Sequence, residues 1–383
     1  VQQYDRNTCG MHWQIHKDGA DTWRHMPPDG RLEVAVVMGS DPIVTYAASC
    51  PLPKDIDEMV FAGFARGRRV EMVQCRTIDL QVPANAEFVL EGYITQGELR
   101  TEGPFGDHTG YYSLADEYPV LHVTAITHRA NAVYPATIVG VPVQEDLWLG
   151  KATERIFLPL LQMVQHEVVD YDLPGEGVFH GCCIVSIAKR FPGHAQKIMH
   201  AIWGTALLSL TKCIIVVDET VDVHDYHAVA TAVAEHYDPV SGTDFTRGPI
   251  DVLDHAPTLM GFGGKIGIDA TTPWASEGRH APERDIVDET AVADWAAQSG
   301  CANVLIAGGG AQGRMVVFAI DKQRGWQGRD LLRAFADAPC SRGVRIAVTV
   351  DASVDVHALG DVAFRTFGNT DPVRDGACIN GML

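Results

Sequence analysis

The sequence predicts a multidomain protein of mixed α+β and α/β class, in which a mostly β domain precedes an α/β domain. Three observations predict it. Residues 1 to about 145 carry short segments of strand-forming residues separated by turn-forming residues. From about residue 150, strand-like and helix-like segments alternate. Parts of this second region recur about 133 residues further on, which indicates a duplicated βαβα unit.

The first domain, which we place at residues 1–148, is expected to be a barrel or a sandwich because its strands are short and numerous. One helical segment interrupts the strands at Asp57–Arg66, where apolar residues recur at helical spacing and Asp55 is a candidate N-cap. The expected strands are Leu32–Met38, Val70–Gln74, Phe88–Ile94 and Val120–Thr127.

The α/β domain is placed at residues 149–275. It begins with a helix at Lys151–Gln165, which has leucine, isoleucine and phenylalanine at helical spacing. The elements expected to follow are the strands Cys183–Ile187 and Cys213–Val217 and the helices Gly193–Ile202 and Tyr226–Glu235. Residues 272–290 are polar and charged and predict a linker.

The last region, residues 291–383, is predicted to be a diverged copy of the α/β unit. Three separate matches at one offset, without gaps, are hard to attribute to chance. The offset places Val217–His224 on Val350–His357, Asp238–Val240 on Asp371–Val373, and Ile184–Ile187 on Val317–Ile320.

A glycine pattern in the tail resembles a dinucleotide fingerprint, but its setting argues against one. Gly308, Gly310 and Gly313 form GxGxxG after an apolar strand. The fingerprint needs a helix to follow, because the helix N-terminus holds the pyrophosphate. Met315–Ile320 follows instead and predicts a strand.

Composition excludes several classes of protein. The chain of 383 residues has 30 basic against 49 acidic side chains and a net charge of −19, which disfavours nucleic acid or an anionic membrane as a partner. No apolar run reaches the roughly 18 residues of a membrane span, and no signal peptide is visible. The nine cysteines include one adjacent pair and no CxxC, which indicates buried thiols in a reducing cytoplasm.

Two carboxylates around a Gly-Pro-x-Gly bend are candidates for proton transfer. Glu102 and Asp107 lie five residues apart, and the glycines and proline between them allow a tight, rigid turn. Neighbouring carboxylates repel each other, which raises one pKa and leaves a protonated acid beside an ionised one. By spacing alone, the alternative of a turn with two solvated acids is favoured. Phe105, Tyr111 and Tyr112 supply apolar surface that shifts the balance towards a site.

His16 and Glu58 are the best pair of metal ligands by residue type, since imidazole with carboxylate suits Mn, Fe or Zn. No HxH or HExxH spacing supports them, so a surface histidine and a solvated helix residue remain the simpler interpretation. Lys265 follows three glycines in Gly261–Lys265, where a loop would expose backbone amides and a lysine to phosphate. A plain turn is the alternative there.

At these residues the sequence closely resembles the UbiD family of reversible decarboxylases, which use prenylated FMN. The resemblance spans roughly residues 1–275, and the EGPFGDHTGYY run is highly specific. The matching segments are DRNT (5–8), GMHWQ (10–14), CPLP (50–53), VPANAE (82–87), LEGY (90–93), EGPFGDHTGYY (102–112), RFPGHA (190–195) and GKIGIDAT (264–271).

The resemblance implies roles that spacing alone does not establish. It makes Asp107 the proton donor, with Glu102 supporting it in an ionic network. It makes His16 and Glu58 ligands of a divalent metal, usually Mn2+, that bridges the protein to the cofactor phosphate, which Lys265 also contacts. Further cofactor contacts are implied for His12, Trp13, Gln14, Lys17 and Asp18, and a monovalent cation site, K+ by preference, for the backbone around Ala47, Ala48 and Cys50.

The resemblance also implies a fold and a reaction. A split β-barrel would carry the flavin, and the α/β domain would serve oligomerisation as a dimer or a hexamer. Loss of CO2 from an aromatic acid leaves an unfavourable carbanion, and the modified flavin bonds covalently to the substrate and accepts those electrons. A flavin prenyltransferase would supply the cofactor. The RFPGHA segment and Asp107 favour hydroxybenzoates, including prenylated ones, as substrates. Met11, Ile15 and Cys50 are candidate residues of the substrate pocket. The direction of the reaction remains open, because the chemistry can run as carboxylation at high CO2.

Two features depart from the family pattern. The family pattern has an arginine of the acid network immediately before the position of Val1 and a metal-binding asparagine a few residues earlier. Neither residue is in this chain, which begins without methionine. We therefore expect a fragment that binds cofactor poorly and is inactive alone, whereas the full-length parent is active. The duplicated tail is the second departure, since the best-known members do not obviously share it.

Two rival functions remain open. A split-barrel flavin reductase or plain FMN-binding protein explains a barrel but not the paired acids or the candidate metal ligands. An inactive paralogue or assembly subunit would explain the missing arginine and the extra repeat. Bound-flavin absorbance distinguishes the first rival, because unmodified FMN that turns over with NADH favours a reductase.

Overall fold

A computed structural model of the protein describes residues 2–13, 18–28, 30–50, 52, 56–178, 180–279, 286–307 and 314–383. The chain divides into two compact units, Val1–Val139 and Gly140–Leu383, which we describe separately. Within the described residues, no helix combines the length and the apolar character needed to cross a membrane.

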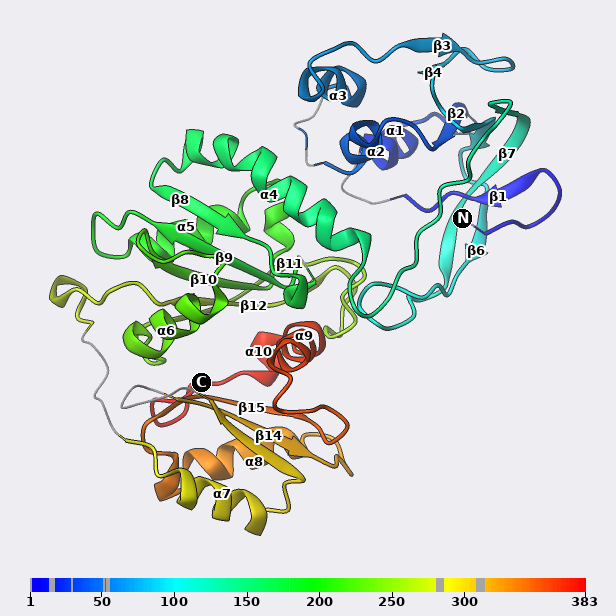
Figure 1. The fold of residues 1–383 in the computed structure, drawn as a ribbon. Coiled ribbons are helices and arrows are strands. Elements are labelled where there is room, and N and C mark those ends of the chain that lie inside the picture. The colour runs from blue at the N-terminus through cyan, green and yellow to red at the C-terminus, as the bar shows by residue number, and fades with distance from the viewer. Residues whose placement is uncertain are drawn as a thin grey trace. The chain divides into compact units, whose positions relative to one another are not determined.

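The first unit is built on an antiparallel sheet with the strand order β1-β7-β5-β2, and β6 pairs with β7 (Figure 1). A separate hairpin pairs β3 with β4. The strands are β1 Thr8–Gly10, β2 Arg31–Met38, β3 Met72–Gln74, β4 Gln81–Pro83, β5 Phe88–Thr95, β6 Leu99–Glu102 and β7 Asp116–His128. The predicted mostly β domain is therefore confirmed, although none of the sheets formed by the described residues closes into a barrel.

Among the described residues three helices accompany this sheet, where the sequence predicts one. They are α1 Asp18–Arg24, α2 Pro42–Ser49 and α3 Glu58–Ala65. The N-cap of α3 is Asp57, whose carboxylate accepts the backbone N–H groups of Met59 and Val60 at 2.7 and 3.0 Å. The predicted cap, Asp55, lies outside the described residues. Helices α2 and α3 pack through Ala47 and Ala62, both fully buried.

The second unit contains a five-stranded sheet in the order β11-β12-β10-β9-β8. Its three central strands are parallel and its two edge strands antiparallel, as expected where helices alternate with strands. Side chains of α4 and α5 pack into the core on one face, and side chains of α6 on the other. The elements are α4 Glu145–Val164, β8 Val168–Asp172, η1 Gly175–Gly177, β9 Cys182–Ile187, α5 His194–Trp203, η2 Ala206–Leu210, β10 Cys213–Asp218, α6 Tyr226–His236, β11 Thr243–Pro249, β12 Phe262–Asp269 and η3 Ala275–Glu277.

The tail of the second unit repeats this arrangement, as the sequence predicts. At an offset of 133 residues, α5 corresponds to α8 and α6 to α9 with both ends in agreement. In each copy an antiparallel edge strand pairs with a strand that has a parallel neighbour on its other side. The tail elements are α7 Glu289–Gln298, β13 Asn303–Ala307, β14 Arg314–Ile320, α8 Gln327–Ala336, η4 Pro339–Ser341, β15 Val344–Asp351, α9 Leu359–Asn369 and α10 Pro372–Asp375.

The GxGxxG segment lies between two antiparallel strands of the tail. Residues 308–313 are outside the described residues, and β14 follows them at Arg314–Ile320. Because a strand and not a helix comes next, the prediction against a dinucleotide fingerprint is confirmed.

The tail packs on the first copy. Phe367 and Leu383 contact the core that α6 shares with the central sheet. Asp371, at the start of α10, accepts the backbone N–H of Gly264 at 3.2 Å. A Cβ at position 264 would lie 2.1 Å from that carboxylate, so only glycine permits this approach.

The predicted linker is anchored along its first part. Lys189 forms a 2.6 Å ion pair with Glu277, and both side chains are nearly inaccessible to solvent. Arg279 pairs with the buried carboxylate of Asp269. Residues 272–279 therefore belong to the folded α/β body, and a free linker is the wrong description of them.

Candidate active site

Glu102 is a buried acid at the end of β6. Its side chain is held against β1, where a Cβ on Gly10 would lie 2.1 Å from Oε2, so the glycine makes room for the carboxylate. The residue is 1% exposed, and Oε2 has no hydrogen-bond partner among the described residues. Burying an unpaired carboxylate oxygen costs free energy unless another group satisfies it, which marks this atom as a candidate for ligand contact.

Asp107 lies in the loop that joins β6 to β7, and local hydrogen bonds fix the loop. The N–H of Asp107 donates to the carbonyl of Tyr111 at 3.0 Å, and the N–H of Ser113 donates to the carbonyl of Phe105 at 2.8 Å. The Asp107 carboxylate lies 3.0 Å from Nδ1 of the buried His108 and is 13% exposed. The loop thus places this carboxylate at a nearly closed but reachable position.

The two acids have different surroundings. Burial alone would raise the pKa of Asp107, but the contacts with His108 and Thr109 outweigh it and hold the pKa below its usual value. From the spacing of the two acids we expect repulsion to raise one pKa, but the pKa of Asp107 is lowered, chiefly through its contact with His108. His108 was missed as a partner although it stands inside the EGPFGDHTGYY run.

His12 and Trp13 follow strand β1 closely along the chain. The His12 ring stacks on Tyr118 of β7 with 4.1 Å between ring centroids. Burial, Asp116 and Glu102 raise the pKa of Tyr118, which is another partner that the sequence did not single out. The indole N–H of Trp13 is buried without a hydrogen-bond partner in the described parts of the chain.

The predicted metal pair cannot be assembled from the described residues. His16 lies outside them, as do Gln14 and Lys17, and Asp18 begins helix α1. Glu58 is the first residue of α3 and is partly buried. Its carboxylate is therefore beside the positive end of the helix dipole. The His16–Glu58 site remains a prediction.

The proposed monovalent cation site falls at the end of α2. Ala47 and Ala48 lie in its last turn and Cys50 is its C-cap. The Cys50 N–H donates to the Tyr46 carbonyl, and its thiol lies 3.0 Å from the Ala47 carbonyl oxygen. Carbonyls at a helix C-terminus are partly unsatisfied and carry negative potential, which suits a cation.

Lys265 stands in a strand, so the predicted glycine loop is wrong. It pairs with Thr246 across β11 and β12. Its ammonium group is buried and donates to the carbonyls of Ser209 at 2.7 Å and Thr211 at 2.8 Å. Burial and the nearby Lys212 lower the pKa of Lys265 to about 7. The glycines of this strand serve close packing, as at Gly264.

The chain belongs to the UbiD family. Residues 1–142 match the family's sequence model described as the 3-octaprenyl-4-hydroxybenzoate carboxy-lyase Rift-related domain. Residues 147–270 and 300–383 match the model of the C-terminal domain of the same carboxy-lyase. The duplicated tail is therefore part of the family's C-terminal domain, and our expectation that it departs from the family is wrong.

Curated relatives are similar over most of the chain. An uncharacterised protein of Archaeoglobus fulgidus is 53% identical over 291 residues, which cover 75% of this chain and 60% of the relative. One of Aquifex aeolicus is 51% identical over 287 residues, covering 74% of this chain and 59% of the relative. The chain thus spans about 60% of the length of these relatives.

Solved structures of UbiD-class enzymes are also similar. HmfF from Pelotomaculum thermopropionicum, in complex with FMN, is 31% identical with a TM-score of 0.59 over 70% of this chain and 60% of its own. An evolved dimeric form of HmfF contains prFMN and has a TM-score of 0.60 at 29% identity, over 74% of this chain and 61% of its own. Vanillic acid decarboxylase of Sedimentibacter hydroxybenzoicus, in closed form, has a TM-score of 0.67 at 28% identity, over 78% of this chain and 63% of its own.

Proposed function

We propose that this protein catalyses the reversible, non-oxidative decarboxylation of an aromatic acid, a hydroxybenzoate by preference, with prenylated FMN as cofactor. The observation that carries the proposal is the buried Glu102 carboxylate beside the loop that fixes Asp107. Family membership and the flavin-containing structures of similar enzymes support it.

The polar groups of the first unit fit a bound flavin. Glu102 Oε2 and Trp13 Nε1 are both buried, and neither has a hydrogen-bond partner among the described residues. An acceptor and a donor left unpaired in this way are costly in an empty protein and are satisfied when a polar ligand arrives. We assign further cofactor contacts to His12, Gln14, Lys17 and Asp18. In this proposal the first unit is the split β-barrel that carries the flavin.

We assign the proton donation to Asp107. Decarboxylation replaces a carbon–CO2 bond with a carbon–hydrogen bond, so each turnover consumes one proton at the reacting carbon. His108 stabilises the ionised form of Asp107, and an anionic substrate placed beside the carboxylate opposes that effect and raises its pKa. We assign Glu102 the supporting role in the acid network.

The remaining groups have supporting roles. The bound cofactor would supply an electrophilic centre that accepts the electron pair left by CO2. We assign a Mn2+ ion to His16 and Glu58, and K+ to the backbone at Ala47, Ala48 and Cys50. Both ions would hold anionic or carbonyl oxygen ligands in place. We also propose that the protein is a homo-oligomer and receives its cofactor from a flavin prenyltransferase.

The test is hydrogen–deuterium exchange at the ring carbon of 4-hydroxybenzoate and related phenols in D2O, together with CO2 release from the matching acids. The protein is expressed from its complete coding sequence together with a flavin prenyltransferase and is supplied with Mn2+. We expect Asp107→Asn to abolish both reactions and Glu102→Gln to reduce them by about 100-fold or more. Glu117→Gln, an exposed acid on the same strand pair, is the matched control and leaves them unchanged.

Two results would overturn the proposal. Full activity of Asp107→Asn removes the assigned donor. Unmodified FMN that turns over with NADH, without CO2 release, identifies the chain as a flavin reductase.

A further inference from the structure

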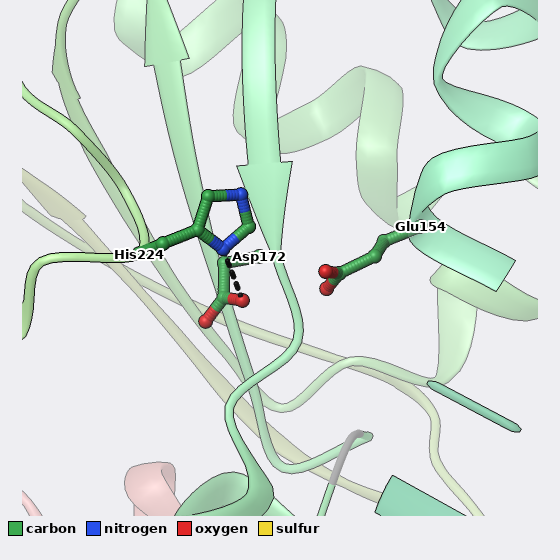
Figure 2. A group of neighbouring side chains, drawn as sticks. All are labelled: Glu154, Asp172 and His224. Atoms are coloured by element: carbon green, nitrogen blue, oxygen red, sulfur yellow. Dashed lines mark hydrogen bonds and ion pairs between the residues drawn. The ribbon is translucent and has the colours of Figure 1, made fainter. Parts of the chain in front are cut away.

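A compact polar cluster lies in the second unit, far along the chain from the residues of the proposed active site. Glu154 comes from α4, Asp172 ends β8, and His224 follows β10 (Figure 2). One potential ligand atom of each lies within 4.8 Å of the others. The positions 154, 172 and 224 have no motif spacing, so no local pattern in the sequence indicates this cluster.

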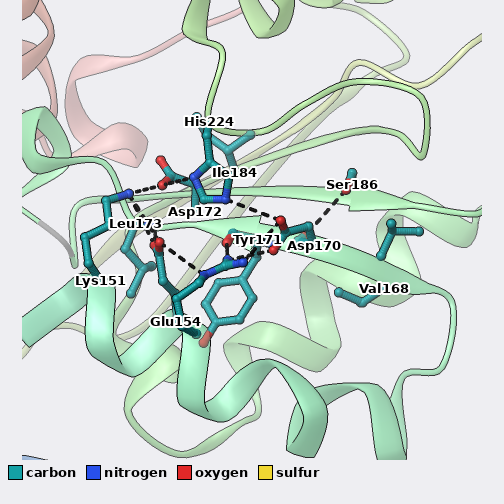
Figure 3. Close-up of polar contacts among 12 residues, drawn as sticks. Lys151, Glu154, Val168, Asp170, Tyr171, Asp172, Leu173, Ile184, Ser186 and His224 are labelled. Carbon is teal, nitrogen blue, oxygen red and sulfur yellow. Dashed lines mark hydrogen bonds and ion pairs between the residues drawn. The ribbon is translucent and has the colours of Figure 1, made fainter.

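The two carboxylates of the cluster are buried. Glu154 is 1% exposed and accepts the backbone N–H of Leu173 at 2.8 Å. Asp172 is fully buried and accepts the hydroxyl of Tyr226 at 3.0 Å. Lys151 lies against both carboxylates with a side chain that is 30% exposed, so it is the removable cation of the cluster (Figure 3).

Both ring nitrogens of His224 contact carboxylates. Its Nε2 lies 3.3 Å from Asp170, a carboxylate that Arg155 holds at 2.6 Å. If Nε2 carries the proton for this contact, Nδ1 presents a lone pair to an Asp172 oxygen only 2.9 Å away. Two such acceptors repel each other unless a proton or a cation lies between them. Metal-bound histidines typically donate the other ring N–H to a carboxylate in the same way.

The ligand spacing suits a small divalent ion. Adjacent ligands of an octahedral ion at about 2.1 Å lie about 3.0 Å apart. The Nδ1–Oδ1 distance between His224 and Asp172 is 2.9 Å. The charges of the cluster agree with this, because among the described residues the carboxylates of Glu154, Asp170 and Asp172 face two lysine or arginine side chains, Lys151 and Arg155. A divalent ion in place of Lys151 would neutralise the cluster while His224 stays uncharged.

The duplicated tail shows that the fold does not need this cluster. Strand pairing places Leu305 where the first copy has Asp172, because Asp172 pairs with Ile184 and Leu305 with Val317 at the same offset of 133. An apolar residue thus occupies the position of Asp172 in the second copy. Buried charges are costly to retain where hydrophobic residues suffice, so their presence indicates another role.

We propose that Glu154, Asp172 and His224 bind a divalent transition metal ion such as Mn2+, Fe2+ or Zn2+, with Lys151 as the internal counter-ion that the metal displaces. Two carboxylates with one imidazole form a ligand set suited to these ions. The site is separate from the metal assigned to His16 and Glu58 and does not depend on the proposed decarboxylase function.

The test is metal binding to chelator-treated protein, followed by calorimetry with Mn2+ and Zn2+ and by the visible absorption of Co2+. Glu58→Gln is introduced throughout, so that the other expected metal does not contribute. We expect one ion per chain. His224→Ala should weaken binding by about tenfold or more, and Lys151→Met should strengthen it by a similar factor, because the competing ammonium is lost.

The tail supplies the matched control. His357 is the counterpart of His224 at the offset of 133, and it has no carboxylate pair like Glu154 and Asp172 among its own counterparts. His357→Ala should leave binding unchanged, and circular dichroism confirms that each variant is folded. Equal affinities of His224→Ala and His357→Ala would overturn the proposal. Failure of Lys151→Met to bind metal would also overturn the proposal. It would indicate that a proton on His224, and not a metal ion, lies between Nδ1 and the Asp172 carboxylate.

Discussion

Replacing Lys265 with methionine is expected to remove a pH dependence from the stability of the second unit. The ammonium group is buried in β12 and has two carbonyl partners, and burial together with Lys212 lowers the pKa of Lys265 from 10.5 to about 7. In the unfolded chain the lysine regains its ordinary pKa. Between these two values the unfolded state binds more protons than the folded state, so stability rises with pH.

The expected magnitude follows from that difference. Each pH unit inside the window contributes at most about 1.4 kcal/mol to the free energy of unfolding. From pH 7 to pH 9 the wild-type protein should therefore gain on the order of 2 kcal/mol from Lys265. The methionine variant loses the hydrogen bonds to Ser209 and Thr211 at every pH, which lowers its stability by a constant amount but adds no slope.

The assay is urea unfolding followed by circular dichroism at several pH values between 7 and 9. Subtracting the variant from the wild type removes the contributions of all other titrating groups. Lys322→Met, at an exposed position in the tail, is the control and should keep the wild-type slope. Parallel pH profiles for the wild type and Lys265→Met would refute the reasoning.

Three further predictions concern packing, capping and the pKa of Asp107. Gly264→Ala should destabilise the second unit by about 1–3 kcal/mol, because its Cβ would overlap the Asp371 carboxylate, and urea unfolding measures the loss. Asp57→Ala should cost about 1 kcal/mol through loss of the α3 N-cap, visible as a lower melting temperature, while Asp57→Asn should retain most of the stability. His108→Ala should raise the pKa of Asp107, because the contact that favours the ionised carboxylate is lost. On acidification, the stability that the ionised carboxylate contributes should then be lost at a higher pH than in the wild type. Carboxyl-carbon NMR titration measures this pKa, and an unchanged value would contradict the prediction.

Local sequence determined much of this protein. The constant offset of the repeat predicted the second copy, and α8 and α9 begin and end where α5 and α6 place them. This succeeded because helix and strand preferences depend on residues close in sequence. The specific run at 102–112 likewise identified the family, through its match to a pattern of many residues.

Other features needed the tertiary structure, because they depend on contacts between distant segments. Glycines before Lys265 suggested a loop, whereas the approach of Asp371 explains Gly264 within a strand. From the spacing of Glu102 and Asp107 we expected repulsion to raise the pKa of one of these acids. The contact with His108 instead helps to lower the pKa of Asp107.

The metal cluster is the clearest case of this division. Glu154 lies on α4, Asp172 ends β8 and His224 lies in the turn after β10, so only the tertiary fold gathers their ligand atoms. Sequence alone therefore determined the family, the order of elements and the repeat. The tertiary structure decided which charges are buried together, because burial and pairing are set by contacts that no local pattern records.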